Sequence, residues 1–359
     1  MDKKIILAAL TAVCVARAGA QTPSPKPEAA SPTPQMTSSI PPKAPIDSLA
    51  PAEIDEAIRL LKSNFIAPNA LKDQEINRAT LEGLLKRLQG GAIILPANAG
   101  GNSNPAAPFY SEILNNHIGY VRIGSLTNDN LRELDKTLAN FAAKKVDAMV
   151  IDLRASTSMN EFDIAAEVTK RFVPKGKTLW SLHKTNPHQD RTFVNERDPA
   201  FQGITMVLID GETSGAAEPI AAALKAAAQG LLIGQPTAGC AVEYSDFSIG
   251  GGKTLRVAVG EAVSSDGHSL FPGGVKPDLP AEMPASLKRQ IFLSSAQRGI
   301  APFVFEMERP HFNEAALMAG TNPELDSRQQ RRSPEDNLHD AVLQRAVDVI
   351  ASVAVFQKR

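Results

Sequence analysis

Apolar residues follow two periods along this chain, one typical of helices and one of buried strands. Spacings of three and four residues predict helices at these places: two within 52–89, one over 129–144, one ending at Pro174, one after Gly215 and one over 338–350. Short apolar and β-branched runs predict strands over 118–123, from residue 146, and over 206–209, 231–233, 255–259 and 261–263. Strands and helices alternate from residue 118 onward, which predicts an α/β fold with a mostly parallel, covered sheet.

The N-terminal segment has the pattern of an export signal. Two lysines precede an apolar stretch over 5–16, and Ala18-Gly19-Ala20 forms an A-x-A cleavage site. The stretch is too short to span a bilayer, so we expect a mature chain that begins near Gln21 and holds no integral membrane segment. Such a protein would be periplasmic or secreted. Cys240 would be its sole cysteine, so its stability would depend on its core and not on disulfides.

Composition divides the rest of the chain into further parts. Residues 21–51 are rich in proline, serine, threonine and alanine, which predicts a disordered linker. Residues 294–333 show no regular pattern, and their basic run over 328–332 is typical of a solvated segment. The expected organisation is a signal peptide over 1–20, a linker over 21–51, a helical region over 52–90, the core over 109–283, and a C-terminal extension with a terminal helix over 284–359.

Charge and composition exclude several classes of function. The chain has a formal net charge of −1, with acidic and basic residues interspersed, and export would move this charge to about −3. Aromatic residues make up 5% of the chain, so neither a basic patch nor a stacking platform predicts nucleic-acid binding. The six histidines lack zinc-ligand spacing, and we expect no metal site and no cofactor. His268 lies in a Ser-Asp-Gly-His sequence that predicts an exposed hairpin turn.

The stretch Met206–Cys240 has a turn where serine hydrolases place their nucleophile. An apolar strand ends at Ile209, a turn over 210–215 follows, and an alanine-rich helix comes next. Backbone N–H groups and the helix dipole favour developing negative charge at such a helix N-terminus. A second apolar strand and a glycine-rich turn over 234–239 complete the segment.

This segment resembles the catalytic segment of the C-terminal processing (tail-specific) serine peptidases, which use a Ser–Lys dyad. The match has no gap and is anchored on Glu218, Leu224, Gly234, Thr237 and Gly239. The family's serine then falls on Gly215 and its lysine on Cys240. Glycine has no side chain to attack a carbonyl, and cysteine does not replace a desolvated lysine base. The resemblance therefore implies a site that has lost its dyad.

The resemblance also bears on the oxyanion hole, the fold and the partner. Where the family has an Asn-Pro-Gly-Gly turn, whose glycine N–H serves the oxyanion hole, this chain has Ser156-Thr157-Ser158-Met159. Oxyanion and groove positions fall on Ser158, Met159 and Ala216. The family implies a crotonase-like fold of β-β-α units, closed here by Phe271–Asp278, and an unfolded or extended polypeptide as partner at a sheet edge. Residues 90–108 are too short for the family's PDZ domain.

Alternatives remain open for the site and for the function. Ser214 could act as the nucleophile with a new base, although its simpler role is a hydroxyl cap for the following helix. Lys253 could be that base, although it is typical of an exposed residue at a strand start, and Cys240 is more typical of a packing residue than of a nucleophile. The leading hypothesis is an exported pseudopeptidase that keeps a peptide-binding groove. The alternatives are an active serine endopeptidase using Ser214 and an envelope scaffold or interaction protein.

Overall fold

The computed structural model describes residues 49–96, 107–304 and 338–357, and the chain divides into two units, residues 1–71 and 72–359. The predicted signal peptide, the predicted linker as far as residue 48 and the basic run over 328–332 lie outside the described residues. In the first unit, helix α1 (Pro51–Asn64) precedes the 3₁₀ turn η2 (Pro68–Leu71). Proline suits the first position of α1 because no helical partner exists there for an N–H. No residue of α1 is buried.

A six-stranded sheet forms the centre of the second unit, with the strand order β13-β10-β8-β4-β3-β2. Its strands are β2 (Tyr110–Leu114), β3 (Ile118–Arg122), β4 (Ala148–Asp152), β8 (Ile204–Ile209), β10 (Leu231–Gly234) and β13 (Leu279–Pro280). Strand β2 pairs antiparallel with β3, and the other pairs are parallel. The predicted parallel sheet is therefore confirmed. Its central strands are nearly continuous apolar runs because both of their faces are buried.

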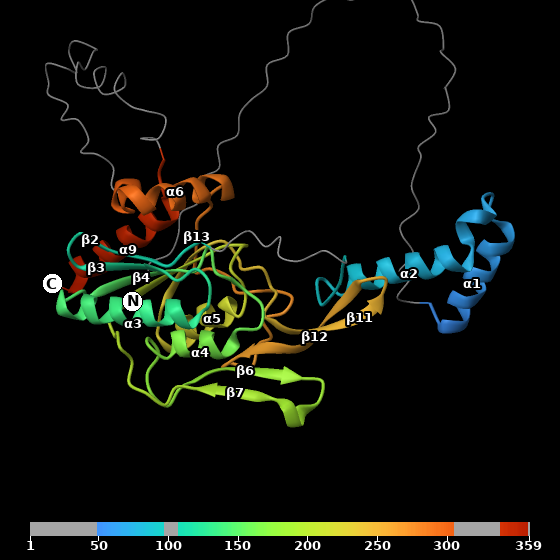
Figure 1. Cartoon of the computed structure of the whole chain (residues 1–359), viewed down its shortest axis with the longest axis horizontal. Helices are drawn as coiled ribbons and strands as arrows, with labels where there is room; N and C mark the ends of the chain where they lie inside the picture. Colours follow the sequence, from blue (N-terminus) through green and yellow to red (C-terminus); the bar gives the residue numbers. More distant parts are fainter. Residues whose placement is uncertain (1–48, 97–106, 305–337, 358–359) are drawn as a thin grey trace, which may run out of the picture. The chain divides into compact units, whose positions relative to one another are not determined.

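Two layers of helices cover this sheet, one on each face (Figure 1). Helices α3 (Asn128–Ala143), α4 (Phe162–Thr169) and α5 (Ala217–Ala227) cover one face, and α6 (Ala285–Arg298) and α9 (Ala341–Gln357) cover the other. Alternation along a strand sends neighbouring side chains to opposite cores. Val207 packs under α3, α4 and α5, whereas Met206 packs under α6 and α9.

A second, antiparallel sheet contains the strand that follows residue 240. Its strands are β1 (Ala92–Leu95), β6 (Thr178–Lys184), β7 (Arg191–Val194), β11 (Val242–Gly250) and β12 (Lys253–Ser264), and the 3₁₀ turn η3 (Pro187–Gln189) joins β6 to β7. Strands β1 and β6 pair with one edge of β12, and β11 pairs with the other edge. The two strands predicted over 255–263 are thus one continuous strand. Lys253 is exposed at its first residue, as expected.

One helix near the start of this unit was predicted, whereas the extent of a helix near its end was not. Helix α2 (Asp73–Arg87) completes the predicted pair of N-terminal helices, and none of its residues is buried. The expectation of irregular structure from residue 294 is wrong at its start. Helix α6 continues to Arg298 because Ile291, Phe292 and Ser295 are buried on its inner side, and the 3₁₀ turn η4 (Ala301–Phe303) follows.

Candidate functional site

A buried carboxylate, that of Glu218 in the first turn of α5, joins the two turns that hold residues 215 and 240. One of its oxygens accepts the N–H of Gly215 at 3.1 Å and the N–H of Cys240 at 2.7 Å. The other accepts the Thr237 hydroxyl at 2.5 Å and the Gly239 N–H at 2.8 Å. Burial raises the pKa of Glu218, and these four hydrogen bonds oppose that rise. The structure therefore brings the two positions at which the dyad was expected together around a residue that the sequence analysis used only as an alignment anchor.

The backbone at Gly215 leaves no room for a side chain. Its φ of +63° lies in the left-handed region, which residues with a Cβ rarely adopt. A Cβ built there would lie 1.5 Å from the carbonyl oxygen of Ser158. This contact arises because β9 (Ser214–Gly215) pairs in parallel with β5 (Thr157–Ser158). The backbone conformation at position 215 therefore favours glycine, which has no side chain that could act as a nucleophile.

The three residues expected to serve an oxyanion hole lie close together, and their polar groups bond within the protein. The N–H of Ala216 donates to the carbonyl oxygen of Ser158 at 3.3 Å. The N–H of Met159 donates to the carboxylate of Glu161 at 2.9 Å, and the Ser158 hydroxyl donates to the same oxygen. An oxyanion hole needs N–H donors aimed at the reacting oxygen. In this conformation the donors of Ala216 and Met159 are already used.

Ser214 does not have the capping role expected from the sequence. The N-cap of α5 is Ala216, because Ser214 and Gly215 pair with β5 and the helix begins only at Ala217. Ser214 is half-buried, and within the described part of the chain its hydroxyl has no hydrogen-bond partner. A serine hydroxyl needs a bonded base to become a nucleophile. The geometry supplies none for Ser214.

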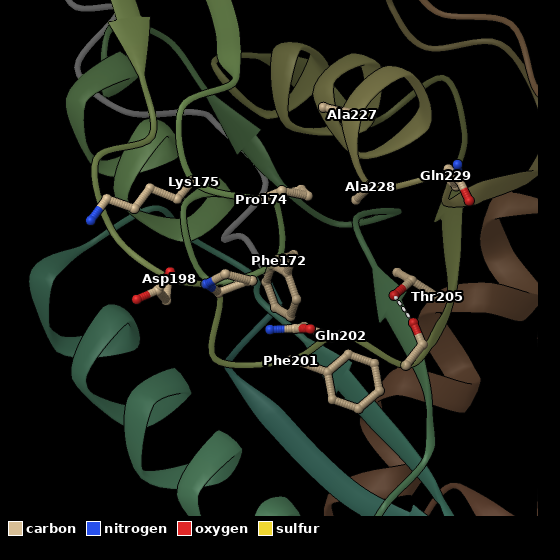
Figure 2. Close-up of a pocket in the computed structure, with 12 residues that line it drawn as sticks. Phe172, Pro174, Lys175, Asp198, Phe201, Gln202, Thr205, Ala227, Ala228 and Gln229 are labelled. Carbon is tan, nitrogen blue, oxygen red and sulfur yellow. Dashed lines mark hydrogen bonds between the residues drawn. The ribbon is translucent and has the colours of Figure 1, made fainter.

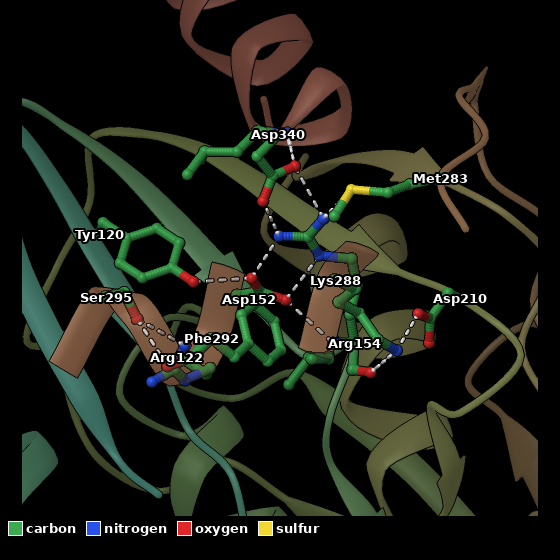
Figure 3. A network of polar contacts seen from close by, with 12 residues as sticks. Tyr120, Arg122, Asp152, Arg154, Asp210, Met283, Lys288, Phe292, Ser295 and Asp340 are labelled. Atoms are coloured by element: carbon green, nitrogen blue, oxygen red, sulfur yellow. Dashed lines mark hydrogen bonds and ion pairs between the residues drawn. The ribbon is translucent and has the colours of Figure 1, made fainter. Parts of the chain in front are cut away.

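A buried lysine of α6, which the sequence analysis did not select, holds the turn before Ser214 (Figure 3). The ammonium of Lys288 contacts the carboxylate of Asp210 and donates to that of Glu212 at 2.8 Å and to the Arg154 carbonyl at 2.6 Å. These three acceptors use its three protons. Burial raises the pKa of Asp210, and the charge of Lys288 opposes that rise. Lys288 therefore fixes the turn that leads to Ser214.

A buried ionic network connects the end of β4 to α9 (Figure 3). Arg154 donates to Asp152 at 3.0 and 2.7 Å and to Asp340, just before α9, at 2.9 and 2.8 Å. The Tyr120 hydroxyl donates to Asp152 at 2.8 Å. Burial disfavours the charged form of Asp152, but the neighbouring Arg154 and these hydrogen bonds hold the pKa of its carboxyl below the ordinary value. The network fixes the Asp-Leu-Arg sequence that leads into the loop after residue 155.

The thiol of Cys240 has the surroundings of a packing residue. It is partly buried, and its sulfur lies 3.8 Å from the Ala238 carbonyl oxygen. Burial and the nearby charge of Glu218 raise the pKa of the Cys240 thiol. Because the thiolate is the nucleophilic form, this shift works against a catalytic role for the cysteine.

The raised pKa of Cys240 predicts slow alkylation. In the chain that begins at Gln21, we expect iodoacetamide to modify Cys240 more slowly in the folded protein than in urea at about pH 8, because the folded state holds less thiolate. The difference should shrink as the pH rises through the raised pKa. Glu218→Gln should speed the reaction by removing the opposing charge. Mass spectrometry measures the rates, and equal rates for folded and unfolded protein across this pH range would contradict the assignment.

A separate hollow of about 470 Å³ lies at the N-terminal ends of the parallel strands, opposite the end that holds the turn over 210–215 (Figure 2). Its lining includes Phe172, Pro174, Phe201, Thr205, Ala228 and Gln229. Thr205 lies near the start of β8, whereas the turn over 210–215 follows its end. Ligands of open parallel sheets bind beyond the carboxyl ends of the strands. This hollow is therefore not part of the candidate site.

In the ranges 49–96, 107–304 and 338–357, no group of three or more His, Cys, Asp or Glu side chains could hold a metal ion. None of the helices in these ranges is long and apolar enough to cross a membrane. His268 lies in the predicted exposed turn, with its ring 3.2 Å from the carboxylate of Asp266.

The parallel sheet, the strand–turn–helix over 204–227 and the glycine-rich turn before residue 240 form an α/β fold with a turn at the place where serine hydrolases hold their nucleophile. Residues 117–281 match the profile of peptidase family S41. This stretch is a little less than half of the chain, and it is similar to the C-terminal processing peptidases.

Similar proteins share only part of their length with this chain. The carboxy-terminal processing protease CtpA of Bacillus subtilis is 27% identical over 230 residues, which cover 60% of this chain and 47% of that protein. The chloroplastic carboxyl-terminal-processing peptidase 1 of Arabidopsis thaliana is 25% identical over 167 residues, 46% of this chain and 34% of that protein. The chain thus spans half or less of the length of these relatives.

Solved structures of other proteins are similar to part of this chain. The photosystem II D1 C-terminal processing protease has a TM-score of 0.42 at 19% identity, with 59% of this chain and 51% of that chain covered. A lipoprotein from Streptococcus agalactiae has a TM-score of 0.45 at 17% identity, with 67% and 88% covered.

Proposed function

We propose that this protein is an exported C-terminal processing peptidase homologue that has lost hydrolysis and keeps a groove for extended polypeptide. Its crotonase-like core of β-β-α units spans 109–283, between a helical region over 52–90 and a C-terminal extension over 284–359. The loss of hydrolysis rests on one observation. The left-handed backbone of Gly215 lies against the Ser158 carbonyl and leaves no space for a Cβ, so no serine fits at the family's position.

The groove is supported by the outer edge of β11, with which no strand of the described residues pairs. Opposite Tyr244, the N–H of Ala258 donates to the Gly91 carbonyl at 2.7 Å, on the side of β12 away from β11. In an antiparallel ladder, this pattern turns the N–H and C=O of Tyr244 away from β12 as well. An edge with such groups binds extended polypeptide by strand addition, which needs neither nucleophile nor base. We infer that unfolded or extended polypeptide is the partner.

Degradation of unfolded casein by the mature chain tests the loss of hydrolysis. We expect intact casein after incubation with the wild type and with Ser214→Ala, both folded by circular dichroism, because Ser214 has no bonded base. An active C-terminal processing protease serves as the positive control for the substrate. Cleavage by the wild type that disappears in Ser214→Ala would overturn the proposal in favour of a rearranged serine peptidase.

A further inference from the structure

The outer edge of β11 is already bonded to one amide, that of the Asn160 side chain. The N–H of Tyr244 donates to Asn160 Oδ1 at 3.0 Å, and Asn160 Nδ2 donates to the Tyr244 carbonyl at 3.3 Å. A residue of a neighbouring antiparallel strand makes the same two bonds with its own N–H and C=O. The carboxamide of Asn160 therefore takes the place of a peptide group at this point of the edge.

The residues beside Asn160 hold its loop in this position. The carboxylate of Glu161 accepts the N–H groups of Met159 and Asn160 at 2.9 and 3.1 Å. The Met159 sulfur lies 3.5 Å from the guanidinium of Arg256, which makes a paired contact at 2.8 Å with Asp246 of β11. The loop is thus attached to the strands β11 and β12 and not only to its own helix.

Within the described residues, the remainder of the edge has no backbone partner. The register between β11 and β12 is regular from Tyr244 to Ser248, so the backbone groups of Asp246 and Ser248 face the same way as those of Tyr244. The side chains of Phe247 and Ile249 are 50% and 49% exposed. This stretch offers an extended chain both hydrogen-bonding groups and apolar contacts. Tyr244, the position of this stretch closest along the chain to Cys240, is the one that Asn160 covers.

We propose that residues 158–161 form a gate, in which Asn160 competes with an extended polypeptide for Tyr244. The inference rests on the proposed peptide-binding function and adds a specific internal competitor to it. A polypeptide pairs first with Asp246 and Ser248, and it reaches Tyr244 when the Asn160 amide leaves. The recognised chemistry is the main chain of an extended segment, because the competing group is itself an amide.

Binding of fluorescein-labelled β-casein, followed by fluorescence anisotropy, tests the gate. Asn160→Ala should bind about tenfold more tightly than the wild type, because two competing hydrogen bonds are lost. Asn64→Ala is a matched control, since Asn64 is also exposed and its amide bonds the Leu60 carbonyl of its own helix at 2.8 Å. Its affinity should equal that of the wild type. Ser248→Pro removes an outward N–H that an edge strand can lose, and it should cancel the gain of Asn160→Ala.

The outcomes separate the gate from the groove. Equal affinities of wild type and Asn160→Ala, both weakened by Ser248→Pro, would overturn the gate and leave the groove. Weaker binding by Asn160→Ala would make Asn160 a ligand contact and also overturn the gate. No binding by any folded variant would overturn the proposed function itself. In hydrogen exchange, the Tyr244 amide should lose its protection in free Asn160→Ala and regain it with casein, and unchanged protection in the free variant would contradict the competition.

Discussion

Replacing Gly215 with alanine is expected to destabilise the protein by about 2–5 kcal/mol. A left-handed conformation costs a residue with a Cβ about 1–2 kcal/mol, and forcing an atom into a filled space costs about 1–3 kcal/mol more. The space is filled here because the Cβ would lie 1.5 Å from the Ser158 carbonyl oxygen. Urea unfolding of the chain from Gln21 onward measures the change in free energy of unfolding.

Gly211 provides the matched control in the same turn. Its φ is not in the left-handed region, and a Cβ there would meet no atom within 4 Å. Gly211→Ala should therefore change the free energy of unfolding by no more than about 0.5 kcal/mol. Similar values for the two variants would show that the pairing of β5 with β9 does not constrain residue 215.

The same geometry predicts what happens when the dyad is restored. Gly215→Ser with Cys240→Lys should remain without activity on casein, because the Ser158 carbonyl occupies the space of the new side chain. In addition, the Ala216 N–H, which is expected to serve the oxyanion hole, already donates to the Ser158 carbonyl. Cleavage by this double variant would mean that the loop over 156–159 moves away readily and that the oxyanion donors become free.

Replacing Asp340 with alanine is expected to cost about 3–5 kcal/mol, because it breaks a buried ion pair and leaves two buried N–H donors of Arg154 without their acceptor. Arg154 and Asp340 are 1% and 0% exposed and make two hydrogen bonds. Asp340 also accepts the N–H of Leu343 at 2.9 Å at the start of α9. The loss should appear as a lower urea midpoint, together with faster amide exchange in α9.

Asp246→Ala is the control for this variant. Asp246 makes a comparable pair with Arg256, but its side chain is 47% exposed, and exposed pairs contribute about 0–1 kcal/mol. Equal losses for the two aspartates would contradict a special role for the buried pair.

The network should also make the free energy of unfolding depend on pH in the acid range. Because the pKa of Asp152 is lowered, its contribution is present above the ordinary carboxyl range, near pH 4, and is lost as the pH falls through the lowered value.

Local pattern was sufficient for the central strands and the helices between them, but not for most strands of the antiparallel sheet. The apolar runs of β4 and β8 predict buried parallel strands, because a strand covered on both faces has no polar side. Gly215 and Cys240 could be assigned by counting from residues such as Glu218, since the spacing of the segment has no gap. The capping role expected for Ser214 was wrong, because the pairing of β9 with a distant strand moves the helix start.

By itself, the sequence determined the α/β class, the order of the central strands and helices, and the glycine and cysteine at positions 215 and 240. These properties depend on periodicity and residue identity, which are local. Only the tertiary structure decided that Ser158 fills the space beside Gly215, that Asn160 bonds Tyr244 and that Arg154 pairs with Asp340. The last two pairs are 84 and 186 residues apart in the chain. Hydrogen bonds and excluded volume act between groups that folding brings together, and no local period encodes which groups those are.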